Sequence, residues 1–287
     1  MTYGWAILII AVVLGALFQL GIFNASTFTP KAPPGACHVF RPNGPGTTSF
    51  INTQGICNGE LPQYVAVFNG QINNFISVTK TSTLNSLGTT GKFTVSAWVY
   101  YTNGDLCNGV FGDWTDPSNG FNLIAGGAGG NNCAPLYVGP NWAALLWPAG
   151  YDYLPQYQWE MITATYDGST GYAAIYLNNQ VFQSGTILSG QGLLESAAFK
   201  IGGVGWTTSG TFKGKMANVQ LYNTSLSSSE IAALFNEGVG GSPVKLSNLV
   251  GWWPLNGDAK DYSGNNNNGA ASGITFTSNW ESGYSSP

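Results

Sequence analysis

The sequence predicts a mainly β protein, with an N-terminal hydrophobic α-helix followed by a β-sandwich, and three observations support this. The first 24 residues carry no charged side chain. A proline-rich stretch comes next, where a long helix cannot continue. From about residue 64, short apolar runs alternate with turn residues, which is typical of an all-β domain. We therefore expect three parts: residues 1–24, 25–63 and 64–287.

The N-terminal segment is apolar around its whole circumference. Residues 3–23 would form a helix of about 32 Å, which is long enough to cross the hydrocarbon core of a bilayer. A helix of this kind needs apolar neighbours on every side, and either lipid or other helices can supply them. A cleavable signal peptide is disfavoured because no basic residue precedes Lys31. The residues expected to be buried are Tyr3, Trp5, Ile9, Val13, Leu17, Leu20 and Phe23.

Residues 25–63 form a connector that contains several prolines and two of the four cysteines. The prolines favour a stiff segment. The apolar leader would deliver the chain to an oxidising exterior, so disulfides are favoured, with Cys37–Cys57 and Cys107–Cys133 preferred among three connectivities. Zinc is the competing interpretation, but the chain has one histidine and no CxxC motif.

The strands of the predicted sandwich are apolar runs rich in β-branched and aromatic residues. They are "YVAVFNG", "NFISVTK", "FTVSAWVYYT", "NGVFGDW", "FNLIAGG", "PLYVG", "WEMITATYDG", "YAAIYLNNQVF", "AFKIGG" and "GKMANVQLYN". Val95, Ala97 and Val99 alternate with polar residues and Trp98, which predicts a half-buried strand. "YDGSTGY" and "LNNQV" predict hairpin turns.

Only one interior helix is expected, over residues 225–238. Ser227 or Ser228 would be its N-cap, Glu230 lies in its first turn, and Gly238 would end it. Its apolar face should pack on the sandwich, and this face consists of Ile231, Leu234 and Phe235.

Composition excludes one class of partner. Charged residues make up 8% of the chain and the net charge is −4, so there is no basic patch for nucleic acid. The sequons at Asn24 and Asn223 are candidate glycosylation sites.

Aromatic residues gather in "VGPNWAALLWPAGYDYLPQYQW". Three interpretations stay open for this cluster: core packing, contact between subunits, and glycan recognition. The candidate residues are Trp142, Trp147, Tyr151 and Tyr153, together with Trp114 and Trp206, which lie beside turn residues elsewhere.

The opening stretch "MTYGWAILIIAVVLGALFQLGIFN" resembles the mature N-terminal helix of archaeal type IV pilin-like proteins. The basic leader found in that family is missing here. The resemblance implies a helix that first sits in the cytoplasmic membrane and then enters the core of a helical filament of identical subunits. It therefore implies an extracellular, cell-surface pilus, with a filament core that contains Tyr3, Trp5, Ile9, Val13, Leu17, Leu20 and Phe23.

The sandwich resembles the laminin-G-like branch of the concanavalin A-like lectin/glucanase superfamily, which implies a jelly-roll fold. The residues that carry the likeness are "GKFTVSAWVYYT", "WEMITATYDGSTGYAAIYLNNQVF", "FKGKMANVQLYNTSLSSSEIAALFNEG" and "LVGWWPLNGDAKDYSGNNNNGA". The "GWWPLNG" element opens the domain in many relatives but lies near the C-terminus here. We expect it to form a permuted or additional edge strand of the same sandwich.

This second resemblance also implies where chemistry would be found. Glucanases of the superfamily place acidic residues close together on one strand, whereas the acidic residues of this chain are dispersed and no GxSxG motif occurs. We therefore predict no enzymatic activity and no required cofactor. Laminin-G-like folds often hold calcium, and the candidate ligands here are Asp258 and Asp261. A polar turn closed by Asx hydrogen bonds is the alternative.

Two functions compete on this evidence. The first is a structural subunit of an archaeal pilus-like filament, with the helix in the core, the sandwich outside, and adhesion to surface glycans as an added property. The alternative is a membrane-anchored, lectin-like protein that binds carbohydrate at the cell surface. The two functions differ in the fate of residues 1–24.

Overall fold

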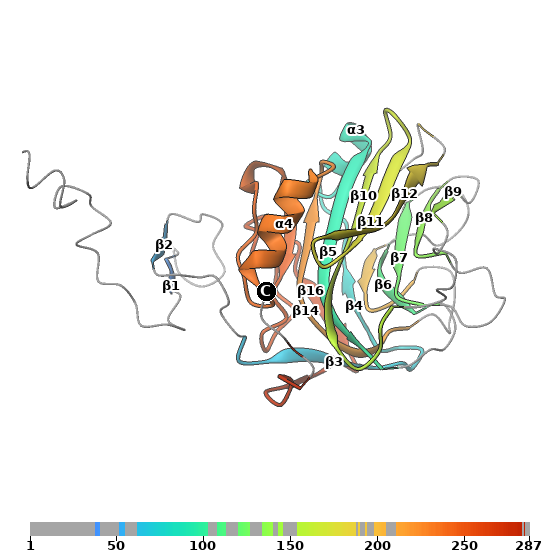
Figure 1. Cartoon of the computed structure of the whole chain (residues 1–287). Coiled ribbons are helices and arrows are strands. Elements are labelled where there is room, and N and C mark those ends of the chain that lie inside the picture. Colours follow the sequence, from blue (N-terminus) through green and yellow to red (C-terminus); the bar gives the residue numbers. More distant parts are fainter. Residues whose placement is uncertain are drawn as a thin grey trace, which may run out of the picture.

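Two antiparallel sheets face each other in the computed structural model (Figure 1). The structure describes residues 38–40, 52–54, 62–102, 108–112, 120–126, 134–139, 143–145, 154–187, 189, 193, 198–204, 211–282 and 284. The predicted helix over residues 1–24 lies outside this part of the chain. Among the described residues, no helix has the length and apolar character needed to cross a membrane.

The large sheet has eight strands and the small sheet has seven. The large sheet has the order β12 (Gln180–Thr186), β11 (Tyr172–Leu177), β10 (Trp159–Asp167), β5 (Lys92–Tyr101), β14 (Lys213–Tyr222), β3 (Val65–Asn69) and β17 (Thr275–Thr277), with β15 (Leu249–Trp253) also paired to β14. The small sheet has the order β16 (Gly269–Ser272), β4 (Phe75–Val78), β13 (Phe199–Ile201), β6 (Gly109–Gly112), β7 (Phe121–Ile124), β8 (Leu136–Val138) and β9 (Ala143–Leu145).

Each of the predicted apolar runs contains a strand, so the mainly β sandwich is confirmed. The patterns did not reveal β9, which lies in the aromatic-rich stretch, or the pair β1 (His38–Phe40) and β2 (Asn52–Gln54) in the connector. The expectation of one interior helix was wrong. A second helix, α3 (Ser86–Thr90), has only five residues, too few for a helical period to be visible, and it is fixed by the buried Leu87.

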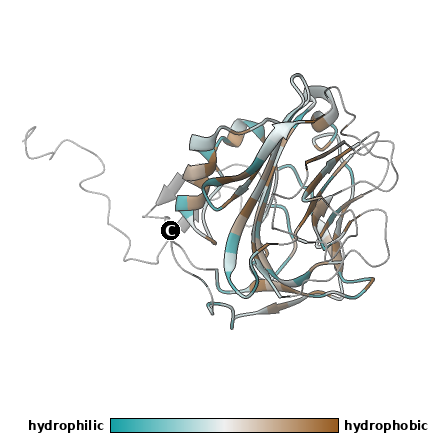
Figure 2. Ribbon diagram, turned by 45° about the vertical axis from the view of Figure 1, so that its right-hand side comes forward, coloured by the Kyte–Doolittle hydropathy of each residue, from teal (hydrophilic) through white to brown (hydrophobic). Residues whose placement is uncertain are grey.

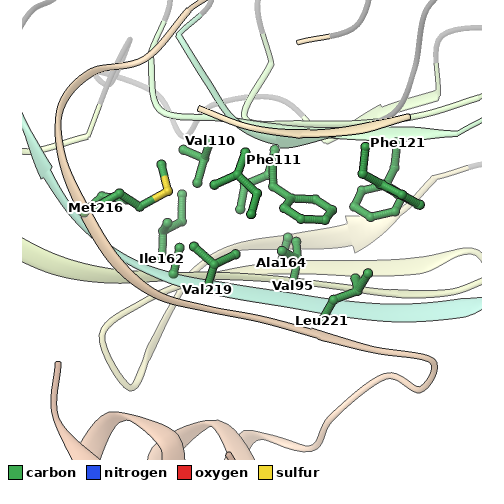
Figure 3. Close-up of a cluster of buried hydrophobic side chains, with 14 of the residues drawn as sticks. Val95, Val110, Phe111, Phe121, Ile162, Ala164, Met216, Val219 and Leu221 are labelled. Atoms are coloured by element: carbon green, nitrogen blue, oxygen red, sulfur yellow. The ribbon is translucent and has the colours of Figure 1, made fainter. Parts of the chain in front are cut away.

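The main core fills the space between the sheets. Figure 3 shows Phe111 and Phe121 of the small sheet pointing toward Val95, Ala164 and Val219 of the large sheet. All five side chains have no exposed surface. Figure 2 shows the hydrophobic residues running along the strands of both sheets. Burial of apolar surface between the two sheets therefore holds the sandwich together.

The strand β5 is buried on both faces, so the prediction of a half-buried strand was wrong. Thr94 and Ser96 are almost fully buried, and Trp98 is 2% exposed. The reason is a third layer: helix α4 (Ser228–Glu237) covers the outer face of the large sheet (Figure 1). The ring of Phe235 stacks on Trp98, with 5.6 Å between the ring centroids.

Helix α4 begins and ends where the sequence predicts. Ser227 is the N-cap and forms a capping box with Glu230: the Ser227 hydroxyl accepts a hydrogen bond from the Glu230 amide at 3.3 Å, and the Glu230 carboxylate accepts one from the Ser227 amide at 2.8 Å. Gly238 ends the helix, and Ile231 and Leu234 are buried. These hydrogen bonds satisfy two amides that a helix start would otherwise leave unpaired.

We expect Ser227→Ala to lower the free energy of unfolding by about 1 kcal/mol, because it removes the cap acceptor. Chemical denaturation followed by circular dichroism measures this. Ser228→Ala is the matched control, since Ser228 lies one residue further on and does not act as the cap. Equal losses in the two variants would show that the capping box contributes nothing.

The C-terminal segment completes both sheets. Strand β15 joins the large sheet beside β14, β16 joins the small sheet beside β4, and β17 returns to the large sheet beside β3. The expectation that "GWWPLNG" supplies a strand of the same sandwich is confirmed, because β15 contains Gly251, Trp252 and Trp253. A short 3-10 helix, η1 (Leu246–Asn248), precedes β15.

Candidate functional site

A pocket of about 330 Å³ lies at one end of the sandwich, where the chain twice crosses between the sheets. One crossing is the turn from β3 to β4, and the other is the turn from β16 to β17. Because β3 pairs with β17 and β4 pairs with β16, the two turns lie side by side. We call this site the amide pocket; its lining residues are Asn69, Gln71, Ile72, Asn73, Asn74, Ser272 and Gly273.

The turn from β3 to β4 is held by amide side chains. Asn74 is 2% exposed, and its side-chain oxygen accepts a hydrogen bond from the Asn69 amide at 2.6 Å. Its side-chain nitrogen donates to the carbonyl of Gly273, which joins the two turns. The Gln71 amide donates to Asn69 Oδ1 at 2.9 Å. Asn74 is therefore a structural residue that fixes the floor of the pocket.

Other lining groups remain available to a ligand. Asn73, Ser272 and Ile72 are exposed, and Ile72 retains 52% of its surface. Within the described part of the chain, no hydrogen bond uses the side chain of Asn73 or of Ser272. An amide both donates and accepts hydrogen bonds, as does a hydroxyl. The pocket thus offers neutral polar groups beside one apolar side chain.

A second group of polar residues lies at the same end of the large sheet, where β10 begins. Glu160 is 7% exposed, and its carboxylate accepts hydrogen bonds from the side-chain amides of Gln158 and Asn178. Burial raises the pKa of Glu160, and the two hydrogen bonds act in the opposite direction. Beside it, Tyr157 is 63% exposed in a left-handed conformation with φ of 61°. Tyr157 and Trp159 are the described aromatic members of the aromatic-rich stretch, and Trp159 is buried.

Most of the residues proposed from the sequence lie outside the described residues. This holds for the aromatic candidates, for the four cysteines, for Asn24 and for the seven residues of the proposed filament core. The glycan-binding, disulfide and filament-core interpretations of these residues therefore stay predictions. The aromatic candidates are Trp114, Trp142, Trp147, Tyr151, Tyr153 and Trp206.

Asp258 and Asp261 lie in one turn after β15 but bind different partners. Both oxygens of Asp261 accept two hydrogen bonds each, from the amides of Trp252, Ser263 and Asn267 and from the Ser263 hydroxyl, at 2.8–2.9 Å. Asp258 accepts from the Tyr262 hydroxyl at 3.1 Å. Among the described residues, no group of three histidine, cysteine or acidic side chains could hold a metal ion. This geometry supports the polar-turn alternative for Asp261, and calcium stays a prediction.

The sequon residue Asn223 is only partly exposed. Its side-chain nitrogen donates to Ser86 Oγ at 3.1 Å, and its oxygen accepts from Asn248 Nδ2 at 2.9 Å. A glycan on Asn223 would take one of the two hydrogens on this nitrogen. Glycosylation at this residue stays a prediction.

Three described acidic side chains form ion pairs with lysines. Asp167 pairs with Lys92 at 2.8 Å, and Glu230 pairs with Lys245 at 2.9 Å while it caps α4. Burial acts on the pKa of Asp167 in the raising direction, but the hydrogen bonds from Lys92 and Ser169 outweigh it and lower that pKa. A retaining glycosidase needs two carboxyl groups about 5 Å apart. Asp167 and Glu230 are each paired with a lysine instead.

The amide pocket was missed in the sequence. "FNGQINNF" was interpreted only as a turn between two strands, although its run of amide side chains is a detectable signal. The other half of the pocket, Ser272 and Gly273, lies about 200 residues away, and no local pattern connects the two halves. Gly273 adopts a φ of +64°, and a side chain there would approach Asn74 Nδ2 within 3.1 Å.

Three solved structures show what the fold is similar to. A candidate carbohydrate-binding protein from Bacteroides ovatus aligns at 22% identity with a TM-score of 0.54, covering 75% of this chain and 60% of that one. Domain 4 of the extracellular arabinanase AbnA from Geobacillus stearothermophilus, solved with arabinotriose, aligns at 26% identity with a TM-score of 0.44, covering 59% and 75%. A heptameric SAP-like pentraxin from Limulus polyphemus aligns at 13% identity with a TM-score of 0.47, covering 74% and 94%.

The chain spans about 60% of the length of the Bacteroides ovatus protein, and that likeness shows the fold alone. A search of curated proteins found no match. A family model described as the concanavalin A-like lectin/glucanases superfamily, of laminin-G type, matches residues 69–232. This match covers more than half of the sequence, so the chain belongs to the concanavalin A-like lectin/glucanases superfamily.

Proposed function

We propose that this protein binds carbohydrate and that the amide pocket is the binding site. The observation that carries the proposal is the chemistry of the pocket: its described lining consists of neutral polar groups and Ile72, and none of these lining residues has an ionisable side chain. Sugar hydroxyls donate and accept hydrogen bonds, which amides can match in both directions. The apolar surface of Ile72 suits the C–H groups of a sugar ring. Membership of a superfamily named for lectins and glucanases, both of which act on carbohydrate, supports a carbohydrate ligand.

We propose that the protein binds carbohydrate without hydrolysing it. The buried Glu160 is hydrogen-bonded to two amides, and Asp167 and Glu230 form ion pairs. None of these carboxylates lines the amide pocket. A hydrolase would need an acid and a second carboxylate at the sugar, so the pocket suits a lectin better than an enzyme.

The same proposal locates the protein outside the cell, with residues 1–24 as its membrane anchor. Surface glycans are found there, and four cysteines are consistent with an oxidising compartment. The filament role predicted from residues 1–24 gains no support from the described residues or from the superfamily match, whereas carbohydrate binding does.

We expect the protein to retain particular members of a panel of neutral and anionic polysaccharides without releasing reducing ends. Oligosaccharides of the retained polysaccharides are then titrated. For the one that binds most tightly, Asn73→Ala should weaken binding about two- to tenfold, because it removes an exposed amide from the pocket. Isothermal titration calorimetry of the full chain gives the affinities, and a reducing-sugar assay run in parallel gives any hydrolysis.

Gln180→Ala is the matched control for this experiment. Gln180 is also an exposed amide, but it lies on β12, at the opposite edge of the large sheet from β3 and β17. The control should bind like the unmodified protein. Equal losses in both variants would place the binding site elsewhere, and steady release of reducing ends would show that the protein is an enzyme.

A further inference from the structure

The lysines in the described part of the chain fall into groups with different partners. Three form ion pairs with carboxylates, and three lie over aromatic rings. The ion pairs are Lys92 with Asp167, Lys245 with Glu230 and Lys260 with Asp258, and the lysines over rings are Lys80, Lys200 and Lys215. Lys213 belongs to neither group. It is exposed, and no described residue forms an ion pair or a hydrogen bond with its ammonium group.

Lys213 stands beside the amide pocket. It is the first residue of β14 and pairs with Asn69, the last residue of β3. Its side chain extends along Gly70: a Cβ atom built on Gly70 would lie 3.1 Å from Lys213 Cβ and 3.4 Å from Lys213 Cδ. Gly70 connects Asn69 to Gln71, and both of these residues line the pocket. The ammonium group follows Cδ after one methylene, so its reach includes the residues beside Gly70, although Lys213 is not itself among those that line the pocket.

Among the described residues, no carboxylate forms an ion pair with this ammonium group. Within the same part of the chain, no carboxylate lines the pocket, and Asp167 and Glu230 pair with other lysines. The protein as a whole carries a net charge of −4 and therefore does not attract anions at long range. Any preference for an anion must come from a local contact, and Lys213 is placed to provide one.

We propose that the amide pocket selects an anionic saccharide, with the amides contacting the sugar hydroxyls and Lys213 contacting the carboxylate or sulfate. This inference rests on the proposed carbohydrate binding and names its ligand class. A charge-assisted hydrogen bond is stronger than a neutral one, but exposure to water reduces its effect to a modest preference. Lys213 is thus a specificity residue, and the amides supply binding common to neutral and anionic sugars.

The test compares ligands that differ only in charge. The full chain is titrated with trigalacturonic acid and with its methyl ester, and separately with a sulfated and an unsulfated galactose trisaccharide. At low salt we expect at least one anionic ligand to bind about three- to fivefold more tightly than its neutral counterpart. Adding salt to about 0.5 M should reduce this preference, because it screens exposed charges.

Variants then assign the preference to one residue. Lys213→Gln should remove the preference while the affinity for the neutral ligand stays the same, and Lys213→Arg should keep it. Lys260→Gln makes the same change in net charge at a lysine that is paired with Asp258, and it should have no effect. A preference that survives in Lys213→Gln, or equal binding of each charged and neutral pair, would overturn the inference.

Failure of the inference differs from failure of the proposed function. If the protein binds neutral sugars but shows no preference for their charged counterparts, the anion selectivity is refuted and the carbohydrate-binding proposal stands. If it binds neither these ligands nor any member of the polysaccharide panel, both are refuted.

Discussion

Replacing Trp253 by alanine is expected to lower the free energy of unfolding by about 3–5 kcal/mol, the range found when a large buried aromatic residue is removed. Trp253 has no exposed surface. The centroids of the Trp253 and Phe111 rings are 6.0 Å apart, so Trp253 joins the large sheet to the small one. Its indole nitrogen donates to the carbonyl of Asn267 at 2.8 Å, and alanine would leave that buried acceptor unpaired.

Two further variants separate the causes of this loss. Trp253→Phe keeps an aromatic ring but removes the indole hydrogen bond, and it should cost less than the alanine variant. Tyr172→Ala is the exposed control, because Tyr172 retains 45% of its surface, and its effect should stay near or below about 0.5 kcal/mol. Chemical denaturation followed by circular dichroism measures all three. A loss below 1 kcal/mol for Trp253→Ala would mean that the C-terminal strands are not part of the cooperative core.

Asp261→Ala is expected to cost about 2–4 kcal/mol, because it leaves several buried donors without an acceptor. Three of the four donors to Asp261 are backbone amides, and two of them, those of Trp252 and Asn267, belong to buried residues. The Asn267 side chain in turn donates to the Val250 carbonyl at 2.7 Å and contacts Thr81 and Thr83. Asp261 therefore ties the loop before α3 to β15, on which Trp253 lies.

Thermal unfolding with and without a chelator tests whether calcium binds at this turn. A carboxylate has about four acceptor positions, and four donors occupy those of Asp261, so we expect thermal unfolding to be unaffected by an excess of EDTA. Asp258→Ala is the control, because its side chain is 35% exposed and should contribute less than 1 kcal/mol. A fall in melting temperature with EDTA that disappears in Asp261→Ala would show instead that Asp261 is a calcium ligand.

The sequence predicted those features that depend on neighbours along the chain. Short apolar runs between turn residues located the strands from β3 to β14 except β9, and the spacing of Ser227, Glu230 and Gly238 located α4. These signals are local because a strand or a helix cap is formed by residues close together in sequence. Short elements such as α3 gave no signal, since five residues span little more than one helical turn.

Only the tertiary structure decided which surfaces are buried and which residues meet. Trp98 looked like a solvent-facing residue of a half-buried strand, yet α4 covers it from a position more than 130 residues later in the chain. For Asp261 the sequence left a calcium ligand and a polar turn open, and the structure shows that its oxygens accept hydrogen bonds from the backbone amides of its own turn and of Trp252.

By itself, the sequence determined a mainly β chain with a short capped helix, a low charge and an amide-rich turn after β3. The tertiary structure alone placed that turn against Gly273 and Lys213 against Gly70, and so created the pocket and set a lysine beside it. The physical reason is that the pocket is made by two crossings between the sheets. Their meeting depends on strand order, which is set by packing of the whole sandwich and not by any local pattern.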